Sequence, residues 1–234
     1  GKERVDDDIY IDSCINNLKN EIDENKEIIA FAGNYEDIIK NDSQGKMSAI
    51  LTIEDGRSVN NSLNKIKDYY NKGIRLISLT WNFENCFGYP NSNDSTIMNK
   101  GLKDFGKEAI EYMNEIGMLI DVSHLSDGGF YDVAKISKKP FVASHSNARA
   151  LTPHPRNLTD EMLKILAEKG GVTGINFSPK FLNDTLTSKD SKIVSMVKHL
   201  NHIRNIGGED ILAVGTDLDG VSGNLEIESV DKMP

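Results

Sequence analysis

The chain has 234 residues and a formal net charge of −9 at pH 7, with 38% apolar and 27% charged residues. This composition fits one soluble globular domain with a sizeable core. The negative charge argues against nucleic acid or an anionic membrane as a partner, so a small molecule is the expected ligand. No stretch approaches the roughly 20 apolar residues of a membrane span, and we expect a cytoplasmic location.

The predicted elements begin with a helix-like stretch from Ile11 to Ile22, after an acidic opening. Six apolar runs follow along the chain, and each is typical of a strand that ends on polar or aromatic side chains. The runs are MSAILTIEDG, ending at Glu54; IRLISLTWN, at Trp81 and Asn82; MLIDVSH, at His124; PFVASH, at His145; GVTGINF, at Asn176; and ILAVGTDLDG, at Asp217 and Asp219.

Segments with helical spacing lie between these runs. Their apolar positions are Leu63, Ile66 and Tyr70; Leu102, Phe105, Ala109 and Met113; Met162, Leu163 and Leu166; and Ile193, Met196, Val197, Leu200 and Ile203. Thr159 is expected to begin the third of these helices. The chain therefore alternates strand and helix.

The strands are apolar nearly throughout, which favours a parallel sheet with helices covering it. A doubly wound sheet gathers its ligands at one switch point, whereas here nearly every strand end carries a polar candidate. This pattern favours an α/β TIM barrel, (β/α)8, whose site draws on many strand ends. Barrels typically need about 250 residues, so this chain is short for a complete one, and we expect residues 1–234 to form a single incomplete barrel domain with about six βα units.

A metal site is predicted where three of the runs end. Glu54, His124 and His145 supply one carboxylate and two imidazoles, a mixture that suits zinc. A single histidine at a strand end is more often structural, but two on successive strands together with a carboxylate favour metal binding.

Two further residues are candidates for work on a substrate. Asp217 lies in GTDLDG, where a strand-end carboxylate can move protons, although Asp-Gly is also a common turn. Arg156 follows a proline-bearing loop and is either a bidentate grip for a substrate carboxylate or a solvent-exposed arginine. The loop 82–99 either covers the site or is a mobile surface insertion. His199 and His202 are expected to be helix-surface or packing residues.

Several segments together resemble the membrane (renal) dipeptidase family of zinc peptidases. They are LTIEDG, GIRLISLTWNFEN, GMLIDVSHLS, VASHSNARALTPHPRNLTDE, GINFSPKFL and AVGTDLDG, in order and spacing over approximately residues 46–221. The resemblance implies a TIM barrel with a binuclear zinc centre that hydrolyses dipeptides and tolerates a D-residue at the C-terminal position.

The resemblance also implies roles for individual residues. Glu54 matches the carboxylate that bridges both metals, and His124 and His145 match the imidazoles of the second metal. The implied substrate-handling residues are Asp217, which moves a proton to the leaving amine; Arg156, which holds the terminal carboxylate; Gly220, whose backbone N–H meets the substrate; and Phe181, which lines the site.

The chain departs from the family pattern in two ways. It contains no His-x-Asp, the pair that completes the first metal site, so two zinc ions are expected only in a complete site and these ligands are not in this chain. The family pattern also extends beyond both ends of the matching segments, so the resemblance implies that the barrel domain of residues 1–234 is truncated at both ends. Trp81 stands where the mammalian enzyme has a histidine that steadies the carbonyl oxygen, and indole has only one donor. Stabilisation of the carbonyl oxygen is then expected to rest mainly on the metal, unless Asn82 or a water molecule substitutes for the histidine.

The sequence therefore predicts a zinc-dependent dipeptidase that hydrolyses dipeptides with a metal-activated hydroxide. A small dipeptide is the expected partner. The sequence does not decide whether the chain forms a homodimer. One alternative is another binuclear amidohydrolase-type barrel hydrolase. Another is a non-catalytic metal- or peptide-binding barrel, if the first metal site is truly absent.

Overall fold

The structure is a computed structural model that describes residues 6–185 and 187–233. Its helices are α1 (Asp7–Glu24), α2 (Tyr35–Ser43), α3 (Leu63–Asn71), α4 (Ser95–Met98), α5 (Asp104–Ile116), α6 (Asp127–Ile136), α7 (Asp160–Glu168), α8 (Pro179–Leu182) and α9 (Ile193–Gly207), with 3-10 turns at Gly56–Val59 and Val230–Lys232. Its strands are β1 (Ile29–Phe31), β2 (Met47–Ala49), β3 (Leu51–Ile53), β4 (Ile74–Ser78), β5 (Leu119–Asp121), β6 (Thr173–Ile175), β7 (Asp190–Ser191), β8 (Leu212–Val214) and β9 (Asn224–Leu225).

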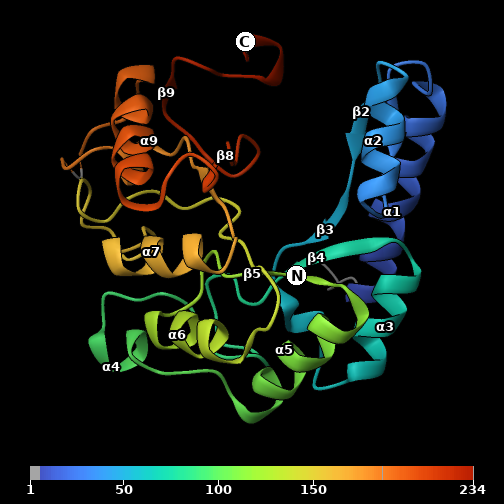
Figure 1. Ribbon diagram of the computed structural model, residues 1–234, viewed down its shortest axis with the longest axis horizontal. Helices are drawn as coiled ribbons and strands as arrows, with labels where there is room; N and C mark the ends of the chain where they lie inside the picture. Colours follow the sequence, from blue (N-terminus) through green and yellow to red (C-terminus); the bar gives the residue numbers. More distant parts are fainter. Residues whose placement is uncertain (1–5, 186, 234) are drawn as a thin grey trace, which may run out of the picture.

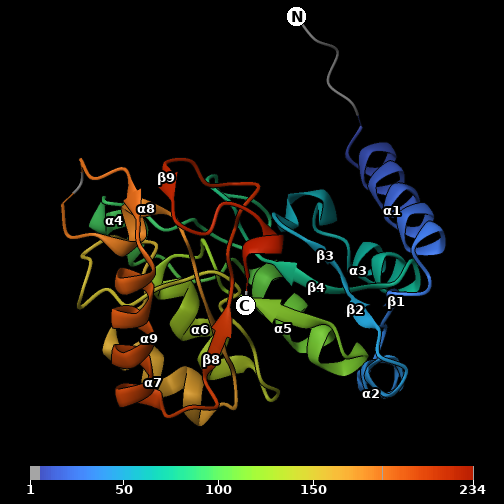
Figure 2. The same ribbon diagram turned by 90° about the horizontal axis from the view of Figure 1, so that it is seen from above.

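The central strands form a parallel row that follows the order of the chain. Figure 2 shows β3 beside β4 at one end of this row, and β8 beside α9 at the other. Strands β3, β4 and β5 form one sheet, and β6 and β8 form another. Residues 142–143 join the two, because single parallel bridges link Asp121 to Val142 and Ala143 to Thr173. The row is therefore β3, β4, β5, residues 142–143, β6 and β8, and all its carboxyl ends point the same way.

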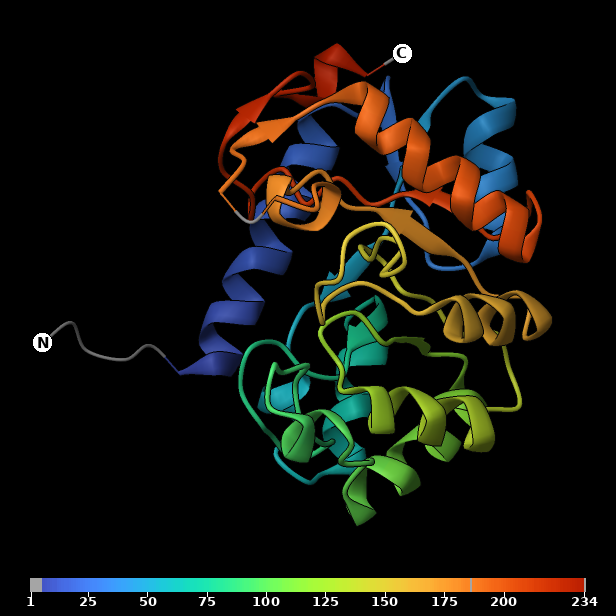
Figure 3. The ribbon, with the colours of Figure 1, turned by 90° about the vertical axis from the view of Figure 1, so that its left-hand side faces the viewer.

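Helices cover the outside of this row, also in chain order. Each helix contacts the next one: α3 contacts α5, α5 contacts α6, α6 contacts α7, and α7 contacts α9. Figure 3 shows α5, α6, α7 and α9 following one another along the molecule. Each helix buries an apolar face, such as Ala109, Ile110 and Met113 on α5. The hydroxyl group of Thr159 accepts the Met162 N–H at 3.2 Å, so α7 begins where the sequence predicts.

The parallel α/β arrangement is confirmed, but the described residues do not close into a barrel. Among them, β3 pairs only with β4 and β8 only with β6. The first predicted strand is wrong in one respect. It is interrupted at Ile50, and its first part, β2, pairs with β1 instead of joining the central row. Figure 1 shows α1, α2 and β2 on the opposite side of the molecule from α9. None of the described helices has the length and apolar character that crossing a membrane requires.

The junction between residues 142–144 and the β6–β8 sheet depends on glycine. A Cβ atom on Gly174 would lie 2.1 Å from the carbonyl oxygen of Ser144 and 2.8 Å from Cα of Gly215. We therefore expect Gly174→Ala to lower the free energy of unfolding by about 1–3 kcal/mol, because the added methyl group overpacks a rigid contact.

Urea unfolding of both variants against the wild-type chain checks this prediction. Gly88→Ala is the matched control, because its Cβ would have its closest contact at 3.5 Å, an ordinary van der Waals distance, and its effect should stay within about 1 kcal/mol. Equal midpoints for the two variants would contradict the close approach at Gly174.

Candidate active site

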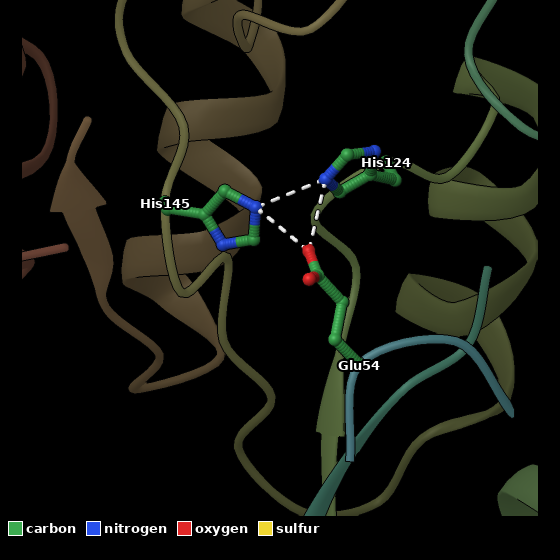
Figure 4. A group of neighbouring side chains, drawn as sticks. All are labelled: Glu54, His124 and His145. Atoms are coloured by element: carbon green, nitrogen blue, oxygen red, sulfur yellow. Dashed lines mark hydrogen bonds and ion pairs between the residues drawn. The ribbon is translucent and has the colours of Figure 1, made fainter. Parts of the chain in front are cut away.

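Glu54, His124 and His145 converge at the carboxyl ends of the parallel strands (Figure 4). The two Nε2 atoms lie 3.0 Å apart, and Oε1 of Glu54 lies 3.1 Å from Nε2 of His124 and 3.4 Å from Nε2 of His145. Within the described part of the chain, this is the only group of three such side chains whose ligand atoms all lie within 4.8 Å of one another. The predicted metal triad is thus brought together.

The donor set of this triad fits a divalent metal ion. A tetrahedral ion with bonds of about 2.0–2.1 Å has ligand atoms about 3.3 Å apart, close to the three observed separations. Burial lowers the pKa of His124 to about 4, so its imidazole is neutral at pH 7, the form that binds metal. The hydrogen bond with His124, the largest influence, holds the pKa of Glu54 well below its usual range, so Glu54 is an anion.

Strained backbone presents two of the site residues. His124 and Asp217 have φ angles of 69° and 58°, in the left-handed region that non-glycine residues rarely occupy. Each such residue costs about 1–3 kcal/mol and persists only where its surroundings enforce the conformation. At His124 they do, because the backbone N–H and the side-chain amide of Asn91 both donate to its carbonyl oxygen, at 2.7 and 3.0 Å.

A cavity of about 490 Å³ opens beside the triad. Eight of the nine predicted site residues line it, and His145 contacts the cavity-lining His124: the eight are Glu54, Trp81, Asn82, His124, Arg156, Phe181, Asp217 and Gly220. The loop after β4 also contributes Asn91, so this loop forms part of the site wall. The cavity thus places the Asp217 carboxylate, the Arg156 guanidinium group and the triad around one space.

Arg156 is the least satisfied polar residue of the site. Its side chain is buried, with only 7% of the residue exposed, and none of its three guanidinium nitrogens has a hydrogen-bond partner among the described residues. Burial lowers its pKa to about 10, which leaves it charged at neutral pH, and Asp121 and Asp217 oppose this shift. The interpretation of Arg156 as a solvent-exposed arginine is therefore wrong.

Asp217 is held by a neighbouring strand end. The side-chain amide of Asn176 donates to its Oδ2 at 3.0 Å, and the buried Asn147 in turn bonds the backbone N–H and the carbonyl oxygen of Asn176. The Gly220 N–H donates to the carbonyl oxygen of Asp217 at 2.9 Å, so it closes a turn within the chain. Gly220 itself still lines the cavity.

Aromatic side chains form another part of the cavity wall. Phe181 packs against His154, with ring centroids 4.7 Å apart, and its ring lies 5.4 Å from the guanidinium carbon of Arg156. Trp81 is 40% exposed at the mouth, 6.4 Å from the His124 ring. Asn82 Oδ1 lies 3.3 Å from Nδ1 of His124, so Asn82 contacts a member of the triad directly.

Two residues that support the site from behind are not among the site residues predicted from the sequence. Ser144 is hydrogen-bonded both to Asp121 and to the ring of His145. Asp121 and Ser144 stand in the same apolar runs that end at His124 and His145. The sequence signal for such support is the Ser-His pair, which is repeated in DVSH and ASH. For His199 the packing alternative is confirmed, because the side chain is buried and its Nδ1 accepts the Ala148 N–H at 3.1 Å.

His199 should make stability depend on pH. Burial lowers its pKa to about 4, whereas an unfolded histidine titrates near 6.5, so the unfolded chain binds more protons between these values. Stability from His199 is therefore fully present above about pH 6.5 and is lost as pH falls toward 4. We expect its loss to reach on the order of 2–3 kcal/mol at pH 4.5.

The measurement is urea unfolding at pH 7.5 and pH 4.5 for the wild-type chain and for His199→Asn, which keeps an acceptor but no titratable ring. The variant should lose less stability between the two pH values. An identical loss in both proteins would contradict the burial of a neutral imidazole.

Comparison with known proteins agrees with the geometry of the site. A family model described as membrane dipeptidase, peptidase family M19, matches residues 11–234. An uncharacterized protein in the pqqA 5′ region of Klebsiella pneumoniae is 36% identical over 195 residues, which cover 80% of this chain and 71% of that protein. An uncharacterized dipeptidase of Schizosaccharomyces pombe is 34% identical over 194 residues, which cover 82% of this chain and 46% of that protein.

Among solved structures, a metallopeptidase from Rhodobacter sphaeroides, bound to a phosphinate mimic of the dipeptide L-Ala-D-Ala, superimposes with a TM-score of 0.85. Its sequence is 28% identical, and the match covers 94% of this chain and 64% of that one. This chain thus spans less than two thirds of the yeast and Rhodobacter proteins. The family model matches this chain over nearly its whole length. The chain therefore belongs to the membrane dipeptidase family, M19.

Proposed function

We propose that this chain carries the active site of a zinc-dependent dipeptidase that accepts a D-residue at the C-terminal position of its substrate. One observation carries the proposal. A buried, charged Arg156 without a hydrogen-bond partner among the described residues shares a cavity with the Glu54, His124 and His145 triad. A guanidinium group in this state needs an anion, and the terminal carboxylate of a dipeptide places a peptide bond one residue away from it.

Arg156 also explains the choice of a dipeptide over longer peptides. A bidentate pair with the terminal carboxylate fixes the substrate in the cavity, so the scissile bond must lie within one residue of that carboxylate. Phe181 covers one face of the Arg156 guanidinium group and keeps the pair out of water. The phosphinate mimic of L-Ala-D-Ala bound by the Rhodobacter relative supports a substrate of this size and a D-residue at its second position.

Glu54, His124 and His145 hold the metal in this proposal. When bound, a divalent metal ion acidifies a water molecule and polarises the scissile carbonyl group. Asp217 accepts a proton at its carboxylate and delivers it to the leaving amine, while Asn176 keeps that carboxylate directed into the cavity. Asn82 and the single indole donor of Trp81 lie at the cavity wall, within reach of the carbonyl oxygen. A second zinc ion would need ligands beyond the triad.

The test is hydrolysis by the zinc-loaded chain of L-Ala-L-Ala, L-Ala-D-Ala, tri-alanine and the C-terminal amide of L-Ala-D-Ala. We expect cleavage of both dipeptides and none of the tripeptide or the amide, because only the dipeptides bring a carboxylate to Arg156. Cleavage of a cyclic amide or a phosphotriester instead would favour another barrel hydrolase. Equal rates on dipeptide and amide would contradict the role of Arg156.

A further inference from the structure

A hydrogen-bonded chain leads from His145 into the core of the molecule. Nδ1 of His145 lies 2.7 Å from the Ser144 hydroxyl oxygen, and this hydroxyl group donates to Oδ2 of Asp121 at 2.6 Å. Asp121 is fully buried at the end of β5 and lies outside the cavity. The chain therefore connects the back of a triad histidine to a buried carboxylate.

The two oxygens of Asp121 have different partners, and this difference fixes where the protons lie. Oδ1 accepts the backbone N–H groups of Ser123 and Ser144, at 3.0 and 2.9 Å. Oδ2 accepts the hydroxyl groups of Ser78 and Ser144. A serine hydroxyl has one proton to give. Because Ser144 gives it to Asp121, the bond to His145 requires Nδ1 to be the donor.

We infer that Asp121, acting through Ser144, is a positioning residue that holds His145 in its Nδ1–H form. In this tautomer Nε2 carries the lone pair, and Nε2 is the atom that faces Glu54 and His124. A metal ligand must present a lone pair, and a carboxylate behind the ring also raises its basicity. The value of this arrangement for metal binding rests on the proposed function, whereas the tautomer itself does not.

The frame that holds His145 is more rigid than the support of His124. Asp121 ends β5 and Ser144 follows the next segment of the parallel row, so the link to His145 joins two neighbouring strand ends. At Nδ1 of the His124 ring, the only hydrogen-bond partner among residues 6–185 and 187–233 is the exposed Asn82, at 3.3 Å. His145 is therefore the ligand whose orientation the core dictates.

The substitution Asp121→Asn tests the inference because its outcome is forced by geometry. The two backbone N–H groups at Oδ1 need an acceptor, so the amide oxygen must take that place. The amide nitrogen then falls at the position of Oδ2 and donates to Ser144. Ser144 must turn its proton toward Nδ1 of His145, which moves the ring proton to Nε2.

The readout is the protonation of each His145 ring nitrogen, measured by ¹⁵N NMR on metal-free protein at pH 7.5. We expect the Nδ1–H form in the wild-type chain and the Nε2–H form in Asp121→Asn. Zinc affinity, measured against a chromophoric chelator, should fall about 10–100-fold in this variant. If Asp121→Asn does not fold, Ser144→Ala gives the same loss of zinc affinity, and Ser144→Thr restores it.

Ser78→Ala is the matched control, because it removes the other hydroxyl donor to Oδ2 and leaves the link to His145 intact. It should keep the Nδ1–H form and the wild-type zinc affinity. An Nε2–H form in the wild-type chain, or equal zinc loss in Ser78→Ala and Ser144→Ala, would overturn the inference. Failure of the dipeptidase proposal would show separately, as a wild-type chain with this tautomer that cleaves no dipeptide.

Discussion

Replacing Glu54 with glutamine is expected to lower dipeptide hydrolysis by about a thousandfold or more, since interactions with a catalytic metal contribute several kcal/mol and each 1.36 kcal/mol is tenfold in rate. The variant keeps the shape of the side chain but removes its charge. The amide also directs N–H groups at one of the two imidazole nitrogens, which lie 3.1 and 3.4 Å from Oε1. A neutral set of ligands that includes a misplaced donor binds a divalent cation poorly.

The measurements are zinc titration against a chromophoric chelator, followed by hydrolysis of L-Ala-D-Ala at saturating zinc. Glu84→Gln is a suitable control, because Glu84 is an exposed carboxylate in the loop after β4 that only approaches Lys103, at 3.8 Å. This control should bind zinc and cleave the dipeptide as the wild-type chain does. Unchanged zinc affinity in Glu54→Gln would remove Glu54 from the metal site.

Replacing Arg156 with methionine is expected to have opposite effects on binding and on stability. The KM for a dipeptide should rise about 100-fold or more, because each charge-assisted hydrogen bond to the carboxylate contributes about 1.5–3 kcal/mol. The free energy of unfolding should increase by about 1–4 kcal/mol, because an unpartnered buried cation is replaced by an apolar side chain of similar length. The buried Arg156 guanidinium group therefore lowers the stability of the fold, and it remains available to bind the substrate carboxylate.

Arg149→Met is the matched control for stability. The Arg149 guanidinium group bonds both carboxylate oxygens of Asp127, at 2.6 and 2.8 Å, and also bonds the carbonyl oxygens of Pro155 and Asn157. Its loss should therefore destabilise the chain by a few kcal/mol. Urea unfolding of both variants and KM for L-Ala-D-Ala are the measurements. An Arg156→Met protein as unstable as Arg149→Met would contradict the view that Arg156 awaits a ligand.

The placement of the candidate site was predictable because it follows from one regularity. Parallel strands bring their carboxyl ends to one edge, so residues far apart in sequence, such as Glu54, His124 and Asp217, meet there. This regularity predicts at which edge of the sheet a side chain lies. It does not predict which buried residues hydrogen-bond to that side chain. The buried Asp121 and Ser144 stand in the same runs, yet their bonds depend on a register that places Ser78 opposite Asp121.

Other features depend on tertiary contacts that no local pattern carries. The apolar run before Glu54 reads as one strand, but it splits at Ile50 because β2 finds its partner in β1 rather than in the central row. His199 sits on a helix among apolar neighbours, and only the fold shows that its ring accepts the Ala148 N–H. Family resemblance supplied the role of Arg156, and the structure adds its burial and its lack of partners.

Crystals of the chain grown with zinc, measured on both sides of the zinc absorption edge, test the central claim most directly. The account predicts an anomalous peak about 2.0–2.2 Å from Nε2 of His124, Nε2 of His145 and a carboxylate oxygen of Glu54. A zinc ion bound only elsewhere on the molecule, with these three side chains free of it, would contradict the account.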